Sequence, residues 1–566
     1  MTEKKQEQGD TLFRSTLRKF EQDKLFQIEE HYRVILDGCL LNKETLMLQY
    51  RADSLFALIL KMYGEGRQEE FFREFRGPFC GALYDKKRDI WFIFTNHTGE
   101  KCVYYYQHPQ GYVASTDVNW IYDICKENQL SLSIDENGVY QLLTFGFMED
   151  DSTCAKEIKR LRGGTYLRIE RGQVAVKSYH TFIKDRSLFE GCREEELVEL
   201  VENAFAAAVK MEFDKDMEYG YGHICDISGG LDSRMNMWVA HDMGYQDFQL
   251  LTYCKSNYLD ELIAKEIAAY WKDALLVKPL DDIRFFYDID KLVKMNGGTS
   301  LYCGITGGER LLETLDWKSF GIQHTGMIGD AVLGSFAESE EEFNRGLPSG
   351  RYSERLRDRL KTNRYQKEFQ DHEIYLQYTR CFRGAANTIQ IRNYFTEVWS
   401  PFMEPDFLQM CMNIPVEFRA GHRIYKTWIL KKHPAAAEYR WEKINGLLTE
   451  SKTCLRMRKL IQRGPQALKR RIGGNRKAVD YGMNPLDYWI ERDSQVSGYM
   501  EAYFEKSETY CSGLLSDELR KDLRLLFETG NGMEKCMALT GYGALMQMLD
   551  GEPFVHQLHD LRGNSK

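Results

Sequence analysis

A glycine-rich hexapeptide near the middle of the chain has the residue types of an anion-binding loop. Its residues, in order, are Ser228, Gly229, Gly230, Leu231, Asp232 and Ser233. The partly β-branched segment 221–227 before it predicts a buried strand, and the apolar spacing of 233–240 after it predicts a helix. Glycines in such a strand–loop–helix unit let backbone N–H groups approach an anion, which the helix dipole also favours.

Asp232 adds a carboxylate to this loop, where it would repel a bare phosphate. Its presence is understandable if a divalent cation lies between the carboxylate and the phosphates. The pattern Ser-Gly-Gly-x-Asp-Ser resembles the loop of the ATP pyrophosphatases, which cut the nucleotide between its α- and β-phosphates. It differs from the Gly-x4-Gly-Lys-Ser/Thr loop, which has a lysine and no internal aspartate. The resemblance implies ATP and Mg²⁺ as ligands, and an ordinary glycine-rich turn is the alternative.

Length and composition indicate a globular protein of two or more domains. The chain has 566 residues, of which 43% are hydrophobic and 28% are charged. Its formal net charge of -9 argues against a general nucleic-acid binder, which would carry a basic surface. We therefore expect no nucleic-acid partner.

The cysteines and the first residues predict a cytoplasmic protein. The 14 cysteines are scattered without a Cys-x-x-Cys pair, which argues against a zinc or disulfide framework. The polar start predicts that there is no signal peptide, and no apolar run is long enough to predict a transmembrane helix. His556 and His559 have metal-like spacing, but we interpret them as surface residues because no partner ligands lie nearby in the sequence.

The N-terminal half alternates between strand and turn signals. A strand is predicted at 32–36, with a turn at Asp37-Gly38 and a continuation at 39–42. Asp53-Ser54 caps a predicted helix at 55–63. Three hairpins follow, at 79–84 with 89–94, at 102–107 with 112–115, and at 165–169 with 174–179. The pattern predicts an α+β domain built as a sandwich of antiparallel sheets.

The order of these segments resembles the class II glutamine amidotransferase domain of asparagine synthetases. The landmarks are Asp37-Gly38 with Asn42, Gly77–Asp85, Thr95–Lys101 with Tyr104-Tyr105, and Val113–Thr116. The resemblance implies an Ntn-hydrolase-like fold for residues 1–185. In the family, this domain frees ammonia from glutamine with an N-terminal cysteine, whose own α-amino group is the base.

The chain departs from that family at the residues that perform the hydrolysis. No cysteine precedes Cys39, which lies inside a predicted strand. Asp37 stands at the oxyanion-hole asparagine, Asn96 at the aspartate that holds the glutamine amine, and Thr116 at a glutamate. We therefore expect no glutaminase nucleophile and a degenerate domain that is retained as a scaffold.

Strands and helices alternate in the C-terminal half. After a linker, a helix is predicted at about 194–211 from its apolar face. The next elements are the strand 221–227, the helix 233–240, the strand 248–254, the helix 260–271 and the strand 274–278. This order predicts a doubly wound parallel sheet, in which ligands lie at the carboxyl ends of strands. Adenosine would then lie at the end of the second strand, which makes Tyr253 a candidate contact.

This half resembles the synthetase domain of asparagine synthetases. The matching segments are Asp260-Glu261, His324–Asp330, Glu397–Asp406, Ile414-Pro415, Lys426 and Arg440-x-x-Lys443. The resemblance implies an ATP pyrophosphatase fold, of the adenine nucleotide α-hydrolase type, over 195–550 with C-terminal helices and a tail at 551–566. It also implies that Asp232 and Asp330 bind magnesium and that Gly326 lies at the pyrophosphate. Lys443 would contact the polyphosphate and stabilise charge, with a solvated surface lysine as the alternative.

Three departures concentrate on the amine side of this site. Met327 replaces the glutamate proposed to handle the proton of the attacking amine, Ala331 replaces a second glutamate, and Trp399 replaces an arginine. The motifs that would bind the nucleotide are kept, whereas the residues expected near the attacking amine are changed. We therefore expect an acceptor bulkier than free aspartate, such as a sugar acid or a peptide.

The sequence thus predicts an asparagine synthetase-like, AMP-forming carbon–nitrogen ligase without glutaminase activity. It would adenylate a small-molecule, glycan or peptide carboxylate, and an amine or ammonia would displace AMP. A tRNA-modifying ATP pyrophosphatase and an inactive nucleotide-binding scaffold remain alternatives. The basic stretch 455–477 is either a patch for an anionic acceptor or membrane surface, or a solvated linker helix, which we favour. A homodimer is compatible with the chain.

Overall fold

The computed structural model describes most of the chain. The described residues are 2–7, 10–64, 68–109, 111–185, 187–303, 309–347, 350–361, 365–369, 371–451, 454 and 482–549. The basic stretch 455–477, the histidines His556 and His559, and the tail 551–566 lie outside them.

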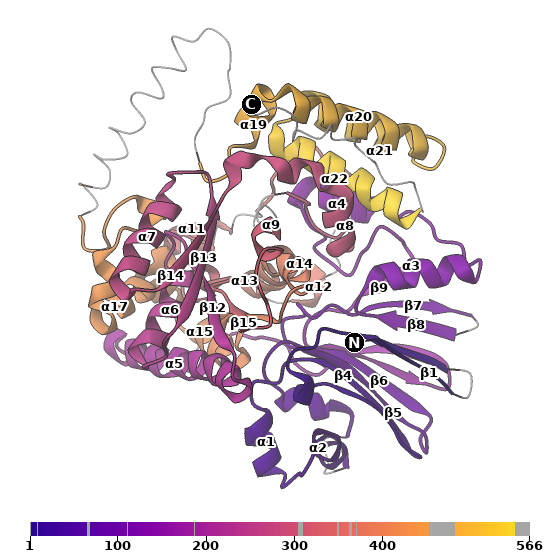
Figure 1. The fold of residues 1–566 in the computed structure, drawn as a ribbon, viewed down its shortest axis with the longest axis horizontal. Helices are drawn as coiled ribbons and strands as arrows, with labels where there is room; N and C mark the ends of the chain where they lie inside the picture. The colour runs from indigo at the N-terminus through magenta and orange to yellow at the C-terminus, as the bar shows by residue number, and fades with distance from the viewer. Residues whose placement is uncertain are drawn as a thin grey trace, which may run out of the picture.

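Antiparallel sheets form the N-terminal half, as predicted (Figure 1). Within the described residues, one sheet has six strands in the order β11-β10-β6-β5-β4-β3, a second has three in the order β8-β7-β9, and β1 pairs with β2. Their bounds are β1 (Thr2–Glu7), β2 (Asp10–Ser15), β3 (Leu25–Ile28), β4 (Tyr32–Gly38), β5 (Phe79–Asp85), β6 (Ile90–Thr95), β7 (Tyr104–His108), β8 (Gly111–Ser115), β9 (Ile158–Arg160), β10 (Thr165–Glu170) and β11 (Gln173–Ser178).

The prediction for residues 37–42 is wrong. Strand β4 continues through Asp37 and Gly38, which pair with Cys80 and Phe79 of β5, so no turn interrupts it there. The strand expected at 39–42 is absent, and a helix follows immediately. The helices of this half are α1 (Lys43–Gln49), α2 (Leu55–Met62), α3 (Val118–Glu127) and α4 (Glu136–Phe145). Helix α2 begins where predicted, because the Ser54 hydroxyl accepts a hydrogen bond from the Ala57 N–H.

A parallel sheet organises the second half, with the order β14-β13-β12-β15-β16 among the described residues (Figure 1). The bounds are β12 (Gly222–Asp226), β13 (Phe248–Cys254), β14 (Ala274–Pro279), β15 (Phe320–His324) and β16 (Val398–Trp399). The first helices are α5 (Glu194–Tyr219), α6 (Asp232–Asp242) and α7 (Leu259–Trp271). The chain extends the sheet from β12 to β13 and β14, and later adds β15 on the other side of β12. The strand order therefore reverses at β12, which is the position where such sheets bind ligands.

Helix α5 is two turns longer than predicted. It continues past residue 211 to Tyr219 and ends at Gly220, which has the left-handed conformation (φ 71°) of a helix C-terminus. The added turns carry Glu212, Lys215 and Asp216, which are buried. Because these residues are charged, the apolar periodicity stops before the helix does.

Short helices connect β14 to β16 and follow the sheet. Their bounds are α8 (Ile289–Met295), α9 (Glu309–Leu312), α10 (Gly329–Val332), α11 (Glu340–Arg345), α12 (Tyr365–Glu368), α13 (His372–Leu376), α14 (Ile389–Arg392), α15 (Pro405–Asn413), α16 (Val416–Arg419) and α17 (Arg423–Lys432). Four further helices, α19 (Leu486–Arg492), α20 (Ser494–Cys511), α21 (Asp517–Thr529) and α22 (Gly532–Met548), complete the described part. Helix α22 packs on α3, α4 and α8, so the C-terminal helices share a core with the N-terminal half (Figure 1).

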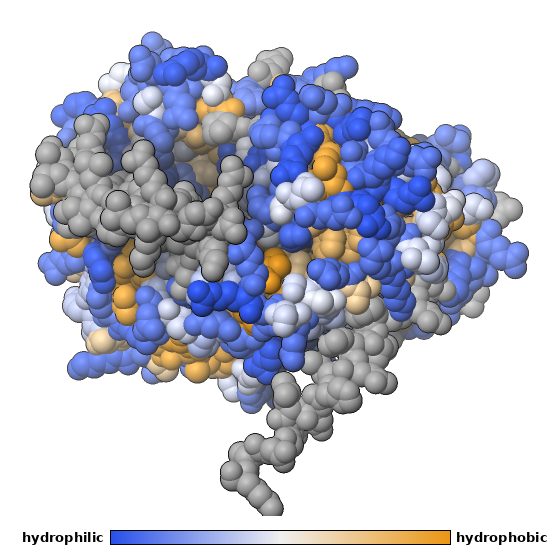
Figure 2. Space-filling view, turned by 90° about the horizontal axis from the view of Figure 1, so that it is seen from above, coloured by the Kyte–Doolittle hydropathy of each residue, from blue (hydrophilic) through white to orange (hydrophobic). Residues whose placement is uncertain are grey.

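The surface is mainly polar on the face seen in Figure 2, where hydrophobic residues occur in small groups. No helix in the described part of the chain has the length and apolar character needed to cross a lipid bilayer.

A buried ion cluster joins the segment after β11 to the helices of the second half. Glu373 on α13 is fully buried and receives two hydrogen bonds from the Arg419 guanidinium, at 2.9 and 2.6 Å, and an ion pair from Lys184. Burial by itself raises the pKa of Glu373, but the two cations outweigh it and lower the pKa to about 2. The cluster therefore favours the ionised carboxylate in the folded state.

Glu373→Gln should destabilise the protein by about 3–5 kcal/mol, because it leaves two cations without their buried carboxylate. The folded-state pKa lies below the ordinary value, so the stabilisation is present above pH 4.5 and is lost as the pH falls from 4.5 toward 2. Urea unfolding at pH 7 and at pH 3 should show that the difference in the free energy of unfolding between wild type and variant is smaller at pH 3. Glu417→Gln, at an exposed position of α16, is the control, and an equal loss in both variants would contradict the prediction.

Candidate functional site

The hexapeptide forms the loop between β12 and α6, at the carboxyl end of the strand. Its two serines brace it, since the Ser228 N–H donates to the Ser233 hydroxyl over 3.1 Å. The Gly229 N–H donates to the Asp260 carboxylate at 2.7 Å, and the Gly230 N–H donates to the Ser228 hydroxyl at 3.1 Å. Helix α6 begins at Asp232 without a side-chain cap, with Leu231 at the N-cap position. The loop therefore brings a carboxylate to the N-terminus of a helix that has no side-chain cap.

Asp232 and Asp330 are brought together from adjacent strands of the sheet. Asp330 lies in the first turn of α10, after β15, and its N–H donates to Asp232 Oδ2 at 2.9 Å. The Tyr425 hydroxyl donates to the other oxygen, Oδ1, at 2.9 Å. Burial and the neighbouring Asp330 carboxylate raise the pKa of Asp232 well above its usual value. Two carboxylates in this arrangement are the hard oxygen ligands that Mg²⁺ prefers.

Close backbone contact between the two loops requires glycine. A Cβ atom at Gly326 would lie 2.1 Å from the Ser233 nitrogen, and one at Gly329 would lie 2.7 Å from the Asp232 carboxyl carbon. Between them, Ile328 has the left-handed backbone conformation (φ 64°), which is unfavourable for a β-branched residue. The surrounding structure holds it there, as its side chain is buried in the core. Strain of this kind concentrates at functional loops.

Lys443 lies at the edge of the same loop. It belongs to the short helix η13 (Glu442–Ile444), which is attached to the hexapeptide by a hydrogen bond from the Glu442 N–H to the Gly229 carbonyl oxygen, 3.0 Å long. The Lys443 ammonium is half-exposed and pairs with Glu338 at 3.1 Å. Its charge also acts on Asp232, whose pKa it lowers against the larger effects of burial and Asp330. The structure thus places Lys443 within electrostatic reach of Asp232, with Glu338 as its ion-pair partner.

Tyr253, at the end of β13, is held by a different set of contacts. Its hydroxyl accepts a hydrogen bond from Arg392 at 2.5 Å, and the same guanidinium donates to Asp226 of β12 at 2.6 Å. The residue therefore lies beside the strand that precedes the hexapeptide. Its contact with a nucleotide stays a prediction.

Arg234 is a residue of this site that the sequence analysis missed. Its fully buried guanidinium donates to the carbonyl oxygens of Gly229, Ala436 and Tyr439, at 3.1 to 3.2 Å. It therefore ties the hexapeptide to the segment that carries Lys443. An arginine at the start of an otherwise apolar helix was the available signal, because a buried charge needs dedicated partners. Tyr425 was also missed, and no local pattern marks it.

An ion cluster around Asp37 joins the N-terminal half to the second half. Lys24 and Lys101 pair with Glu397, just before the Val398–Trp399 strand, at 3.2 and 2.5 Å, and they approach Asp37 to 3.6 and 4.0 Å. Glu397 and both lysines are almost entirely buried. Burial by itself raises the pKa of Asp37, but the lysines hold it below its usual value. A carboxylate in a lysine cluster thus occupies the position of the predicted oxyanion-hole residue.

Two of the other predicted departures, Cys39 and Asn96, are buried. The Cys39 thiol is buried and faces Asp23, and burial and this carboxylate raise its pKa well above the usual value. Asn96 is buried, with its side-chain amide donating to Gly77 and Glu100. Thr116 is exposed. Cys39 therefore lacks the thiolate character that a nucleophile needs.

Comparison with known proteins gives a family for the N-terminal half. Residues 20–180 match the glutamine amidotransferase domain. The chain is 23% identical over 202 residues to "Putative asparagine synthetase (glutamine-hydrolyzing) 2" of Methanocaldococcus jannaschii, covering 35% of this chain and 38% of that protein. It is 23% identical over 278 residues to asparagine synthetase (glutamine-hydrolyzing) 1 of Bacillus subtilis, covering 47% of this chain and 42% of that protein. The chain thus spans about two fifths of the length of these relatives.

Among solved structures, glutamine phosphoribosylpyrophosphate amidotransferase from B. subtilis, complexed with ADP and GMP, aligns with 45% of this chain and 73% of its own. The identity is 8% and the TM-score 0.21, too low for an inference. The family assignment rests on the domain match and the two synthetase relatives. Residues 20–180 thus form a glutamine amidotransferase-like domain, in a chain that is similar to asparagine synthetases over part of its length.

Proposed function

We propose that the protein is an ATP-dependent, AMP-forming ligase that adenylates a carboxylate and joins it to an amine or ammonia. The observation that carries this proposal is the meeting of Asp232 and Asp330, joined by the 2.9 Å hydrogen bond at the carboxyl ends of β12 and β15. Lys443 lies beside them, and the uncapped α6 N-terminus faces the same loop. Such a set can hold a polyphosphate and its cation.

The residues present fit ATP and Mg²⁺. Asp232 and Asp330 would hold Mg²⁺, which supplies charge neutralisation at the phosphates when bound. Ser228–Ser233 and Gly326 would line the pyrophosphate site, where Gly326 and Gly329 keep side-chain atoms out of the contact between the loops. Lys443 would stabilise negative charge at the polyphosphate, and Tyr253 is the proposed contact near adenosine. Adenylation is chemically useful because AMP is a far better leaving group than a carboxylate oxygen.

The residues where the attacking amine would bind favour a carboxylate acceptor other than free aspartate. Met327 has no proton-accepting group, and its backbone carbonyl oxygen accepts a hydrogen bond from the Ser400 hydroxyl at 3.0 Å, which fixes the loop. Ala331 and Trp399 are buried in the core, so neither supplies the charged group that it replaces. We infer a carboxylate acceptor with an apolar or bulky part, of the sugar-acid or peptide class.

ATP–pyrophosphate exchange with a panel of carboxylates, aspartate included, tests the ligase function. Exchange that requires both Mg²⁺ and one class of carboxylate is expected. ATP binding without exchange for any carboxylate would instead favour an inactive nucleotide-binding protein, an alternative that Met327 and Ala331 also favour. Absence of both binding and exchange would contradict the nucleotide site itself.

The N-terminal half is proposed to have no glutaminase activity. The Asp37 carboxylate would repel a developing oxyanion, and the buried Cys39 thiol has a raised pKa. Glutamate release from glutamine should not exceed that of heat-killed protein, with or without ATP and acceptor. Release above this control would refute the proposal, and Cys39→Ala would then identify or exclude that thiol as the source.

A further inference from the structure

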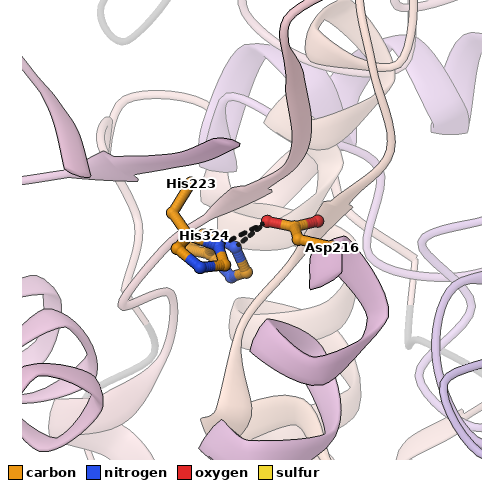
Figure 3. A group of neighbouring side chains, drawn as sticks. All are labelled: Asp216, His223 and His324. Carbon is orange, nitrogen blue, oxygen red and sulfur yellow. Dashed lines mark hydrogen bonds and ion pairs between the residues drawn. The ribbon is translucent and has the colours of Figure 1, made fainter. Parts of the chain in front are cut away.

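A second cluster of polar side chains lies on the helix α5 side of the parallel sheet. Asp216 comes from α5, His223 from β12 and His324 from the end of β15 (Figure 3). Both imidazoles direct a ring nitrogen at the same carboxylate oxygen, Asp216 Oδ2, over 3.0 Å from His223 Nδ1 and 2.8 Å from His324 Nε2. All three residues are buried. The cluster is separate from the carboxylate pair of the proposed ATP site.

The donor atoms have the identity and spacing of a metal site. One nitrogen from each histidine and one carboxylate oxygen lie within 4.8 Å of one another. Donors around a tetrahedral zinc ion are about 3.3 Å apart, given bonds of about 2.0–2.2 Å. The two nitrogen–oxygen distances to Asp216 Oδ2, 3.0 and 2.8 Å, are a few tenths of an ångström shorter than this. A small outward movement of the two rings would therefore admit an ion.

The surrounding groups orient these donors as in metal sites. Glu212, one turn before Asp216 on α5, places Oε1 3.3 Å from His324 Nδ1, the ring nitrogen that faces away from the donor group. The Ile322 N–H donates to Asp216 Oδ1 at 2.8 Å, and Phe213 stacks on the His324 ring with centroids 3.9 Å apart. Metal-bound histidines usually give their second N–H to a carboxylate, which fixes the ring, and Glu212 is the carboxylate nearest to His324 Nδ1.

The negative charge of the carboxylates in this cluster needs a positive charge nearby. Glu212 and Asp216 bring two carboxylates into a region without solvent access, and neither Glu212 oxygen has a hydrogen-bond partner of good geometry. Two protonated imidazoles or one dication could balance them. With one dication, both histidines are neutral ligands, and the Glu212 carboxylate receives the N–H of His324.

We propose that Asp216, His223 and His324 bind a divalent transition metal, with Zn²⁺ as the expected ion. Imidazole and carboxylate donors suit Zn²⁺, and three protein ligands leave one position of a tetrahedral ion unfilled. Because full burial leaves no route for a substrate, the role assigned to the ion is structural. The ion would fasten α5 to β12 and β15. His324 is two residues before Gly326, so the same ion would hold the start of the loop that carries Asp330. The proposed metal binding does not depend on the proposed ligase activity.

Metal analysis of the full-length protein tests the proposal. The protein is produced without a histidine tag in zinc-supplemented medium, freed of loose metal by gel filtration, and measured by inductively coupled plasma mass spectrometry. One zinc ion per chain is expected. Background zinc in the folded wild-type protein would overturn the proposal by itself, whatever the variants do.

Variants locate the ion. His223→Gln and His324→Gln should each reduce zinc to background, whereas His433→Gln should retain it. His433 is the matched control, because it also lies between two carboxylates, Asp242 at 2.7 Å and Glu202 at 3.0 Å, but has no second histidine. Production with Co²⁺ should give the visible absorption of a tetrahedral cobalt site in wild type and His433→Gln. Unchanged zinc in both cluster variants, with folding verified by circular dichroism, would place the ion elsewhere and refute the assignment.

Discussion

Asp232→Asn is expected to abolish ATP–pyrophosphate exchange while the protein stays folded. The substitution keeps the shape of the side chain and, through Oδ1, the hydrogen bond from Tyr425. It replaces the oxygen that accepts the Asp330 N–H by an amide nitrogen, and it removes the negative charge proposed to bind Mg²⁺. Loss of a group that only supports a metal ligand lowers metal affinity or activity about 10–100-fold, so loss of a ligand itself should lower the exchange rate more. Asp330→Asn should have a comparable effect, because the two carboxylates would hold the same ion.

This prediction is tested by measuring ATP–pyrophosphate exchange rates at saturating Mg²⁺, with the thermal unfolding of each variant measured in parallel. The unfolding temperature should change little, because relief of the repulsion between the two carboxylates offsets the lost hydrogen bond from the Asp330 N–H. Asp247→Asn is the control, as it lies in an exposed turn with a left-handed backbone that asparagine also tolerates. Exchange near the wild-type rate in either site variant would remove that aspartate from the magnesium site.

Met327→Glu is expected to increase the formation of asparagine from aspartate, ATP and ammonium. The unmodified protein should form it slowly or not at all, because Met327 cannot take the proton that the attacking amine loses. General base catalysis contributes about 10²–10⁴-fold, which bounds the gain from a correctly placed carboxylate. The loop is already fixed by the Ser400 hydrogen bond to the Met327 carbonyl oxygen, so the change affects the side chain more than the backbone.

Met327→Gln is the matched control, since it has the size of glutamate without its basicity. Asparagine measured by chromatography should rise in the glutamate variant alone. A rise in both variants would indicate an effect of polarity, and would contradict the role of a base. Efficient asparagine production by the unmodified protein would refute the bulky acceptor and indicate ordinary asparagine synthesis.

Local sequence patterns determined much of the second half of the fold. The mainly apolar segment Phe248–Cys254 is β13 with the predicted bounds, and most of its residues are buried, as expected of a strand covered on both faces. The alternation of strands with helices 233–240 and 260–271 was likewise sufficient to predict the parallel sheet. The glycine-rich loop was predicted at the carboxyl end of β12, where the structure has it.

Local patterns failed where charged residues are buried or where pairing is long-range. The last turns of α5 escaped detection because Glu212 and Asp216 point into the protein and break the apolar period. The turn predicted at Asp37-Gly38 does not exist, because pairing with β5 keeps those residues in the strand. Turn propensity is weak beside a complete ladder of backbone hydrogen bonds.

The sequence by itself determined the chemical types present: a glycine-rich loop with one carboxylate, a second aspartate in a related motif, and a changed amine side. Only the tertiary structure decided which charges meet. Asp330 reaches Asp232 across 98 positions of the chain, and Lys101 of the N-terminal half meets Glu397 beside β16. The two histidines of the buried cluster meet Asp216 for the same reason: β12 and β15 are neighbours in the sheet although they are far apart in sequence. Sheet order sets such contacts, and sheet order depends on the packing of the whole chain rather than on any local pattern.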